Sequence, residues 1–421
     1  MVNKKSSIPQ NIAVVGGGVI GLCIALKLQL AGENVTIFDK RGVGEGCSKG
    51  NAGHFATEQV FPLATPALLP QLPKMLLSPT SPVSVRFQDV HRTLPWMVRF
   101  LLKARKKASE HATQALTELN RVAMENWFEL LEQVGLSELI TMQGSLLTFE
   151  SESLFDSYRS TLNRLREQGV NCQVWEQERL RDELPYLSAN VKKGVFFPDT
   201  GHTSNPYRMC IEMADVFESM QGRWIKEQVD DVFFDGELGV VVTPSLSHEF
   251  DKVVIATGAE SAPLVKKITG VKVPIQAERG YHLMVPKLKN CLPFPVSSAD
   301  RKFIMTPMET GLRLAGTVEY ADIDSPPNMQ RANMLKGLAT GLLKPECELD
   351  SVGESWMGNR PSLPDSLPVI DTALNGKVLL AFGHQHLGLT QGAITAALIS
   401  QLHTESETIV DLSPFALDRF C

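Results

Sequence analysis

The first 39 residues restrict the fold of this chain more than any other segment does. An apolar run over residues 12–15 leads into the turn Gly16-Gly17-Gly18-Val19-Ile20-Gly21, and an apolar helical pattern follows as far as Ala31. A second apolar run over residues 34–38 ends in Asp39. A strand, a glycine-rich turn, a helix and a second strand in this order predict a βαβ unit built on a buried parallel sheet.

The glycines of this unit predict a dinucleotide site. Gly16 permits the tight turn, Gly18 lets backbone N–H groups approach a pyrophosphate, and Gly21 lets the helix pack closely on the strand. Asp39, 18 positions after Gly21, can accept a hydrogen bond from a ribose hydroxyl, and its carboxylate disfavours the 2′-phosphate of NADP. The motif alone leaves NAD and FAD open, and a purely structural turn is the weaker alternative.

The composition is that of an ordinary globular protein. The chain has 421 residues, 43% of them hydrophobic, which suits two or three domains. Its net charge of −6 argues against a nucleic-acid partner. Seven scattered cysteines without a C-x-x-C pair predict reduced thiols in a cytoplasmic setting and no metal site. Neither a signal peptide nor a transmembrane helix is expected, because glycines interrupt the first apolar segment and no apolar run reaches about 18 residues.

The remaining patterns predict two kinds of sheet. Apolar runs at residues 252–259 and 377–384 end in glycine, as the first strand does. Short strands between turn residues predict an antiparallel sheet, and they lie at residues 144–149, 194–197, 280–285, 302–306 and 311–317. Helices are expected at residues 153–168, 206–220 and 389–403, and from Leu94 to about Leu136 in two segments separated near His111.

These patterns predict an α/β fold with two domains. A Rossmann-like, discontinuous dinucleotide domain is expected to comprise residues 1–62, 203–270 and 355–421. A substrate domain with an antiparallel sheet is expected to be inserted as residues 63–202 and 271–354.

Seven motifs in a fixed order carry a resemblance to a known family. They are the opening glycine motif, Gly50-Asn51-Ala52-Gly53-His54, Gly144-Ser145-Leu146, Ile255-Ala256-Thr257-Gly258-Ala259, Arg279-Gly280-Tyr281-His282-Leu283, Arg360-Pro361-Ser362-Leu363-Pro364-Asp365 and Gly383-His384-Gln385-His386-Leu387-Gly388-Leu389-Thr390. Nearly end to end, the chain resembles the D-amino-acid oxidase superfamily of flavoproteins, and within it the D-amino-acid dehydrogenase and glycine oxidase group.

The resemblance implies that the cofactor is FAD, bound without a covalent link in a Rossmann-like FAD-binding domain. The expected contacts are Gly16, Gly18, Val19, Ile20, Gly21, Asp39, Lys40, Cys47, Ser48, Asn51, Ala52, Gly53, Ala256, Thr257, Gly258, Gly383, Leu387, Gly388, Leu389 and Thr390. The helix that follows Gly383 can direct its N-terminal dipole at negative charge on a reduced flavin, so the flavin ring is expected there. Cys47 is expected to be a small buried thiol.

Arg360 is the first candidate for substrate binding. Its guanidinium can bind a carboxylate through two hydrogen bonds. A structural ion pair is the simpler reading of a single arginine, but the resemblance implies that Arg360 binds the substrate carboxylate. Tyr281 is either a phenol donor to the same carboxylate or an ordinary half-buried strand tyrosine. His54 and His386 border the expected flavin site, where each either tunes protonation of the substrate amine or serves only a structural role.

The resemblance implies FAD-dependent oxidation of a D-amino acid or cyclic imino acid, with hydride passing from Cα to flavin N5. The apolar residues Phe55 and Leu387 to Leu389, together with His54 and His386, favour a compact substrate such as D-proline. An oxygen-using oxidase of the glycine or sarcosine oxidase type and a hydroxy-acid or glycerol-phosphate dehydrogenase are the alternatives, followed by a non-catalytic flavin-binding subunit.

A quinone is the expected electron acceptor. Basic residues are interspersed with apolar ones from Arg86 to Lys107, after a proline-rich apolar stretch that begins at Phe61. Such a segment can lie on the cytoplasmic face of an anionic membrane, which makes peripheral membrane contact through residues 61–107 one reading. Packing of the same segment on the substrate domain is the other. The oligomeric state is left open.

Overall fold

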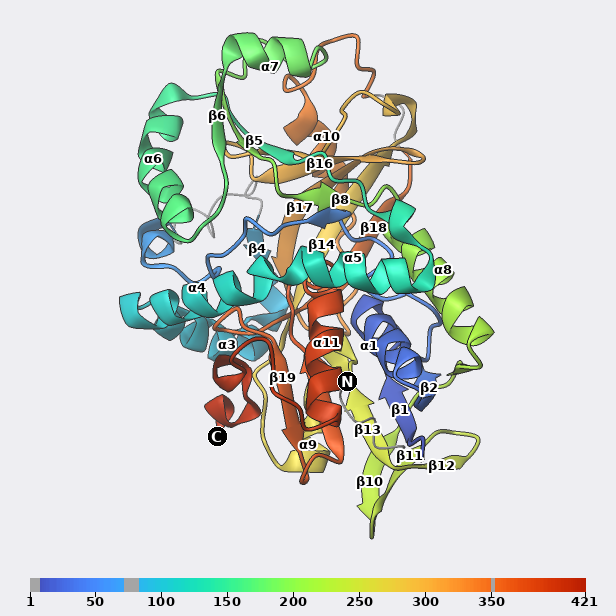
Figure 1. Ribbon diagram of the computed structural model, residues 1–421. Coiled ribbons are helices and arrows are strands. Elements are labelled where there is room, and N and C mark those ends of the chain that lie inside the picture. The colour runs from blue at the N-terminus through green and yellow to red at the C-terminus, as the bar shows by residue number, and fades with distance from the viewer. Residues whose placement is uncertain (1–7, 72–82, 350–352) are drawn as a thin grey trace.

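The computed structural model describes residues 8–71, 83–349 and 353–421, in which two large sheets lie one above the other in Figure 1. The central part of the expected membrane segment and the ends of some expected domain ranges lie outside these residues. The lower sheet has the strand order β19-β20-β13-β1-β2-β9, and its strands are parallel except for β19. Its strands are β1 (Asn11–Val15), β2 (Asn34–Phe38), β9 (Arg223–Ile225), β13 (Lys252–Ile255), β19 (Val369–Ala373) and β20 (Val378–Phe382).

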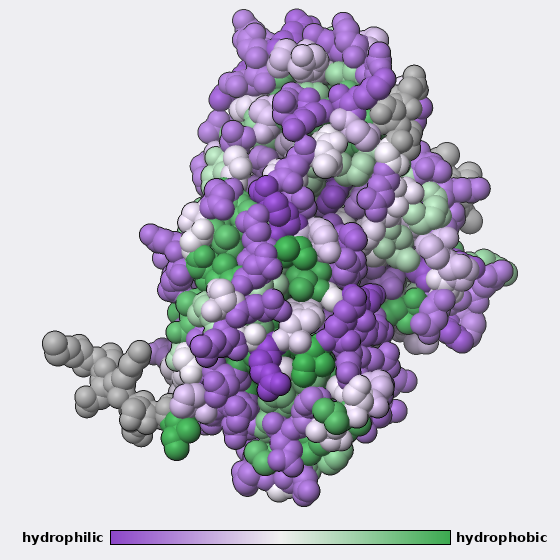
Figure 2. All heavy atoms as spheres, turned by 90° about the vertical axis from the view of Figure 1, so that its right-hand side faces the viewer, coloured by the Kyte–Doolittle hydropathy of each residue, from purple (hydrophilic) through white to green (hydrophobic). Residues whose placement is uncertain are grey.

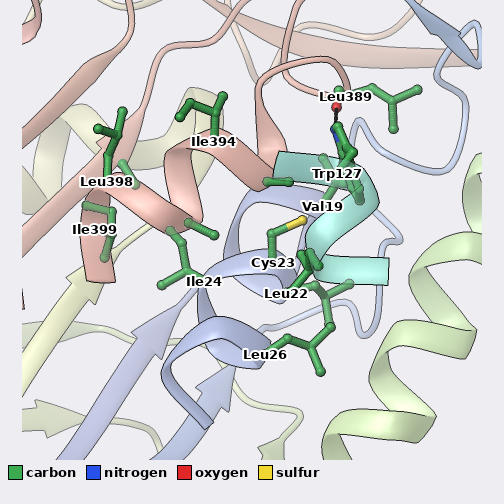
Figure 3. Packing of buried hydrophobic residues seen from close by; sticks show 14 of the residues in the cluster. Val19, Leu22, Cys23, Ile24, Leu26, Trp127, Leu389, Ile394, Leu398 and Ile399 are labelled. Carbon is green, nitrogen blue, oxygen red and sulfur yellow. Dashed lines mark hydrogen bonds between the residues drawn. The ribbon is translucent and has the colours of Figure 1, made fainter. Parts of the chain in front are cut away.

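Helices cover the lower sheet, and their buried side chains form a hydrophobic core with those of its strands. α1 (Val19–Leu30) packs against α11 (Gly392–His403), and α5 (Ala123–Val134) packs against α11 in turn. Figure 3 shows this contact, in which the indole Nε1 of Trp127 donates a 2.9 Å hydrogen bond to the carbonyl of Leu389. Buried residues of α4 (Lys106–Arg121) belong to the same core. Residues 106–134 therefore pack with the dinucleotide unit, although the sequence placed them in the substrate domain.

The upper sheet is largely antiparallel. Its strand order is β18-β14-β17-β16-β15-β5-β7-β6, with β4 paired to β17. The pairs β15–β5 and β17–β4 are parallel. The strands are β4 (Val83–Val85), β5 (Ser145–Phe149), β6 (Gln173–Glu176), β7 (Lys193–Phe197), β14 (Gln276–Val285), β15 (Val296–Ser298), β16 (Phe303–Met308), β17 (Gly311–Tyr320) and β18 (Ser355–Ser362). The antiparallel sheet that the sequence predicts is confirmed. However, β18 belongs to it, so the expected boundary at residue 355 is wrong.

The remaining elements surround these sheets. The helices are α3 (Val90–Lys103), α6 (Glu152–Glu167), α7 (Gln177–Glu183), α8 (Pro206–Ser219), α9 (Ser261–Thr269) and α10 (Gln330–Ala339). Two small antiparallel sheets are formed by β3 (His54–Phe55) with β8 (Gly201–His202), and by β10 (Asp231–Asp235), β11 (Leu238–Val242) and β12 (Ser247–Phe250). Short 3-10 helices cover Pro66–Gln71, Phe87–Asp89, Ser137–Leu139, Gly258–Glu260, Pro286–Leu288, Ser413–Phe415 and Leu417–Phe420.

The helical region after Leu94 differs from its prediction. It forms the three helices α3, α4 and α5, and the break expected near His111 is wrong. Buried Ala112, Leu116 and Leu119 keep one apolar stripe along α4, so the helix continues through His111. The chain leaves the helical conformation at Arg105, and α4 ends at Arg121, with Val122 as its C-cap. Within the described residues, none of the helices has the length and apolarity needed to cross a bilayer.

Candidate active site

A cavity of about 1030 Å³ is lined by residues from both large sheets. The residues predicted to bind or act on substrate, Arg360, Tyr281, His54 and His386, all contribute to its walls. The predicted cofactor residues on its walls are Gly16, Gly18, Val19, Ile20, Asp39, Lys40, Cys47, Ser48, Asn51, Ala52, Ala256, Thr257, Gly258, Gly383, Gly388 and Leu389. Gly21, Gly53, Leu387 and Thr390 are not among the residues that line it.

Two glycines fix the turn between β1 and α1. Gly16 has φ +111°, and a Cβ there would lie 2.4 Å from the carbonyl oxygen of Ala256 at the end of β13. A Cβ on Gly21 would lie 1.9 Å from the carbonyl oxygen of Gly16. The predicted tight turn and close packing of helix on strand are therefore confirmed, and the N-terminus of α1 faces the cavity.

Asp39 braces this turn from the end of β2. Its Oδ2 accepts a 2.9 Å hydrogen bond from the backbone N–H of Gly17, and its Oδ1 accepts from the N–H groups of Arg41 and Gly42. The carboxylate also lines the cavity, as the ribose contact requires. The neighbouring Lys40 forms an ion pair with Glu260.

The loop from Cys47 to Gly53 connects the cofactor turn with the upper sheet. The Ser48 hydroxyl accepts a 2.9 Å hydrogen bond from the N–H of Val19 in α1. The ring Nδ1 of His282 in β14 lies 3.0 Å from the carbonyl oxygen of Gly50, and the guanidinium of Arg313 in β17 donates to the carbonyl of Asn51. Burial raises the pKa of the Cys47 thiol to about 11, so the thiol stays protonated at neutral pH.

Arg360 is held in one position by β14. In the register of the upper sheet it lies opposite Glu278, and its Nη1 donates a 3.1 Å hydrogen bond to Oε1 of Glu278. A Cβ on Gly280 would lie 2.6 Å from the guanidinium carbon, which shows that the guanidinium lies against the strand at Gly280. Glu278 was not among the residues predicted from the sequence. Its only sequence signal is that it stands two positions before Gly280, on the same face of a strand.

Tyr281 points to the other face of β14. Its hydroxyl donates a 2.7 Å hydrogen bond to Glu319 and accepts one from the N–H of Asn328. Arg279, on that same face, forms an ion pair with Glu319. Burial and the hydrogen bond to Glu319 raise the pKa of Tyr281 to about 12. This geometry favours the strand-tyrosine reading over a phenol contact with the substrate carboxylate.

The two candidate histidines are neutral at physiological pH. Burial lowers the pKa of His386 to about 4, and burial together with His202 lowers the pKa of His54 to about 3. The Nε2 of His54 lies 3.8 Å from Oε2 of Glu58, which is beyond hydrogen-bond distance. Burial raises the pKa of Glu58 to about 7.

Phe55, which was expected near the flavin, is not among the residues that line the cavity. It is fully buried and packs edge-to-face on Trp127, with ring centroids 5.5 Å apart. Leu387 is also part of the core beneath α11, whereas Leu389 lines the cavity. The apolar character of these segments therefore reflects domain packing as well as the cavity wall.

The residues present fit FAD. The cavity is lined by the turn before α1, by Asp39 and by the ends of β13 and β20, and then by the loop at Ser48 and Arg360. A dinucleotide requires this succession of a ribose acceptor, backbone donors at a helix N-terminus and an adjoining reaction site.

Comparison with known proteins identifies the family. The model of the family "FAD dependent oxidoreductase" matches residues 11–402. D-amino-acid oxidase from Bradyrhizobium diazoefficiens is 30% identical over 420 residues, covering 98% of this chain and 99% of that protein. D-amino acid dehydrogenase from Paramagnetospirillum magneticum is 25% identical over 425 residues, covering 97% and 98%.

Solved structures share the fold. Glycine oxidase from Geobacillus kaustophilus has a TM-score of 0.74 at 22% identity, covering 98% of this chain and 100% of that one. L-proline dehydrogenase from P. horikoshii has a TM-score of 0.75 at 18% identity, covering 98% of both chains. The chain thus belongs to the family of FAD dependent oxidoreductases and is an enzyme of the D-amino-acid oxidase and dehydrogenase type, with FAD as its cofactor.

Proposed function

We propose that the enzyme dehydrogenates a compact D-amino acid or cyclic imino acid such as D-proline and passes the electrons to a quinone. The observation that carries this proposal is the fixed guanidinium of Arg360. It is half-buried on the wall of the cavity that the cofactor turn also lines, and within the described residues its hydrogen bond to Glu278 uses Nη1 alone. The rest of the guanidinium is left for a substrate carboxylate.

In this mechanism Arg360 binds and orients the substrate carboxylate. A charge-assisted, bidentate contact fixes the direction in which the Cα–H bond points. His54 and His386 are neutral, so they line the site without adding charge and can exchange hydrogen bonds with the substrate amine. When bound, FAD supplies a two-electron acceptor for the hydride.

The walls near Arg360 favour a small substrate. Val318 lies opposite Gly280, against which the Arg360 guanidinium rests, and Ile304 and Leu389 line the same cavity as the two histidines. A cyclic imino acid would present an apolar ring to these side chains, and its oxidation gives a cyclic imine that needs no immediate hydrolysis. The histidines could hydrogen-bond to a ring hydroxyl.

A substrate panel tests this proposal. We expect kcat/KM to be higher for D-proline and hydroxylated D-proline than for D-alanine or a bulky D-amino acid. His54→Ala and His386→Ala should change this ranking, because the wrong substrate leaves polar groups unpaired. A bulky acyclic substrate that is preferred by the wild type would refute the substrate assignment and leave amino-acid oxidation intact.

The exposed surface of α3 supports the proposal that the electron acceptor is a quinone in a membrane. Trp96 on its inner side donates a 3.1 Å hydrogen bond to the carbonyl of Ser362, which docks the helix on the upper sheet. Its outer side exposes Leu94, Val98, Leu101 and Leu102, with basic residues at and beyond its C-terminal end at Arg99, Arg105, Lys106 and Lys107. The face shown in Figure 2 carries several separate groups of hydrophobic residues among hydrophilic ones. We infer that α3 rests on the cytoplasmic face of the inner membrane.

The electron acceptor is tested by comparing rates. We expect reduced enzyme to be reoxidised much faster by a soluble quinone analogue than by oxygen, and to sediment with anionic vesicles at low salt. The relative named D-amino-acid oxidase favours oxygen as the alternative acceptor. Hydrogen peroxide formed in step with substrate loss, at the rate seen with quinone, would establish that alternative.

A phosphate-bearing substrate is disfavoured by the position of Glu278. Its carboxylate is adjacent to Arg360 and would repel a phosphate dianion in the same place. Glycerol phosphate should therefore fail to bleach the bound flavin under anaerobic conditions.

A further inference from the structure

Glu278 is a buried acid in the wall of the cavity at the Arg360 end. Its side chain is 4% exposed, and one of its oxygens, Oε1, accepts a hydrogen bond from Arg360. The other, Oε2, has no hydrogen-bond partner within the described part of the chain, although the Tyr320 hydroxyl lies close enough to interact with the carboxylate. Burying a carboxylate oxygen without a hydrogen-bond partner costs free energy of folding, which indicates that Glu278 has a function beyond holding Arg360.

Among the described residues, Arg360 is the charged group that balances the charge of Glu278. Tyr320 in β17, His386 and Cys47 are its other titratable neighbours. Burial lowers the pKa of His386 to about 4 and raises the pKa of Cys47 to about 11, and burial together with Glu278 raises the pKa of Tyr320. All three are therefore uncharged at neutral pH.

Because the Arg360–Glu278 pair is neutral overall, it distinguishes ligands by their charge. A carboxylic or 2-hydroxy acid would bring a single negative charge beside a pair that is already neutral. An amino acid brings a carboxylate and an ammonium group joined through one carbon atom. Arg360 and Glu278 both line the cavity, with Nη1 and Oε1 only 3.1 Å apart, so a positive and a negative group lie side by side on its wall for the two opposite charges of such a zwitterion.

We propose that Glu278 determines substrate specificity by attracting the α-ammonium or ring-ammonium group of the substrate while Arg360 binds its carboxylate. Amino and imino acids are thereby selected over 2-hydroxy acids and simple carboxylic acids. The inference rests on the proposed function, because it requires the substrate carboxylate at Arg360.

Three achiral ligands of nearly equal shape test this role in the holoenzyme. They are 2-aminoisobutyrate, 2-hydroxyisobutyrate and trimethylacetate, which lack a Cα–H bond and cannot be oxidised. Their dissociation constants are measured from the change in absorbance of the bound flavin. In the wild type we expect 2-aminoisobutyrate to bind roughly 10- to 100-fold more tightly than 2-hydroxyisobutyrate, the range of a hydrogen bond to a charged group.

Variants separate specificity from structural support. Glu278→Gln should reduce the preference for the amino ligand to less than about threefold while 2-hydroxyisobutyrate binds as well as before or better, because Arg360 loses its anionic partner. Glu278→Asp should keep part of the preference. Glu45→Gln is the matched control, since Glu45 also lines the cavity but bonds Tyr207 and Lys49. It should leave the ranking unchanged.

Two results would overturn the proposal. One is a wild-type enzyme that binds 2-aminoisobutyrate no more tightly than 2-hydroxyisobutyrate. The other is a Glu278→Gln enzyme in which all three ligands weaken in parallel, as a purely structural role would require. If D-amino acids still bleach the flavin in either case, the proposed function stands without the role of Glu278. If only hydroxy acids bleach it, the proposed function fails.

Discussion

Gly280→Ala is a small change that should disable substrate binding without disturbing the fold. A Cβ at this position would lie 2.6 Å from both Cζ and Nη2 of Arg360 and 2.8 Å from its Nε. The backbone of β14 is extended at Gly280, so alanine introduces no backbone strain. The added methyl group can be accommodated only if the guanidinium moves away from the strand.

The size of this movement sets the expected effect. Carbon atoms in contact lie about 3.5 Å apart or more, so the guanidinium must move by roughly 1 Å. A misplacement of about 1 Å in a positioning group can lower the rate by about 100-fold, or about 2.7 kcal/mol in the free energy of the transition state. We therefore expect kcat/KM on the best D-amino acid to fall by about two orders of magnitude, with unchanged FAD content.

The assay compares Gly280→Ala with a second glycine variant. Gly337 lies in α10, where an added Cβ meets no atom within 4 Å, so Gly337→Ala should keep wild-type kcat/KM. Flavin content and thermal unfolding are recorded for both. A Gly280→Ala enzyme with near wild-type kcat/KM would show that Arg360 does not act from its position over Gly280.

Three further predictions concern the cofactor, the arginine and the buried acid Glu58. The purified protein should be yellow and release intact FAD on acid or heat treatment, and a colourless protein that binds NAD but not FAD would contradict the cofactor assignment. Arg360→Leu should abolish turnover, and Arg360→Lys should also be poor, since either loses the bidentate contact; flavin content should stay constant, and a kcat/KM near wild type in either variant would remove the carboxylate role. Burial raises the pKa of Glu58 from 4.5 to about 7, so the folded state binds the proton more tightly and wild-type stability falls as pH rises through this range. Glu58→Gln should match wild type in urea unfolding near pH 4 and exceed it by up to about 3 kcal/mol at pH 8, and equal stability at both pH values would contradict the raised pKa.

The sequence by itself determined the local parts of the dinucleotide unit. The glycine positions between β1 and α1, the acid at Asp39 and the apolar strands β13 and β20 depend on backbone geometry and burial that neighbouring residues impose. The antiparallel character of the upper sheet followed from alternating strands and turn residues for the same reason. Arg360 was predicted from the resemblance of its motif to a known family. Nothing in the residues next to a single arginine indicates that it binds a substrate.

Only the tertiary structure decided which residues surround that arginine. Glu278 and Arg360 are 82 positions apart, and they meet because β18 pairs with β14 in a register that no local pattern specifies. Long-range contacts likewise bring Glu319 to Tyr281, and the packing of α4 and α5 on α1 and α11 places residues 106–134 with the dinucleotide unit. Periodicity predicts that a strand or helix has an apolar face, but the partner of that face is fixed by long-range packing.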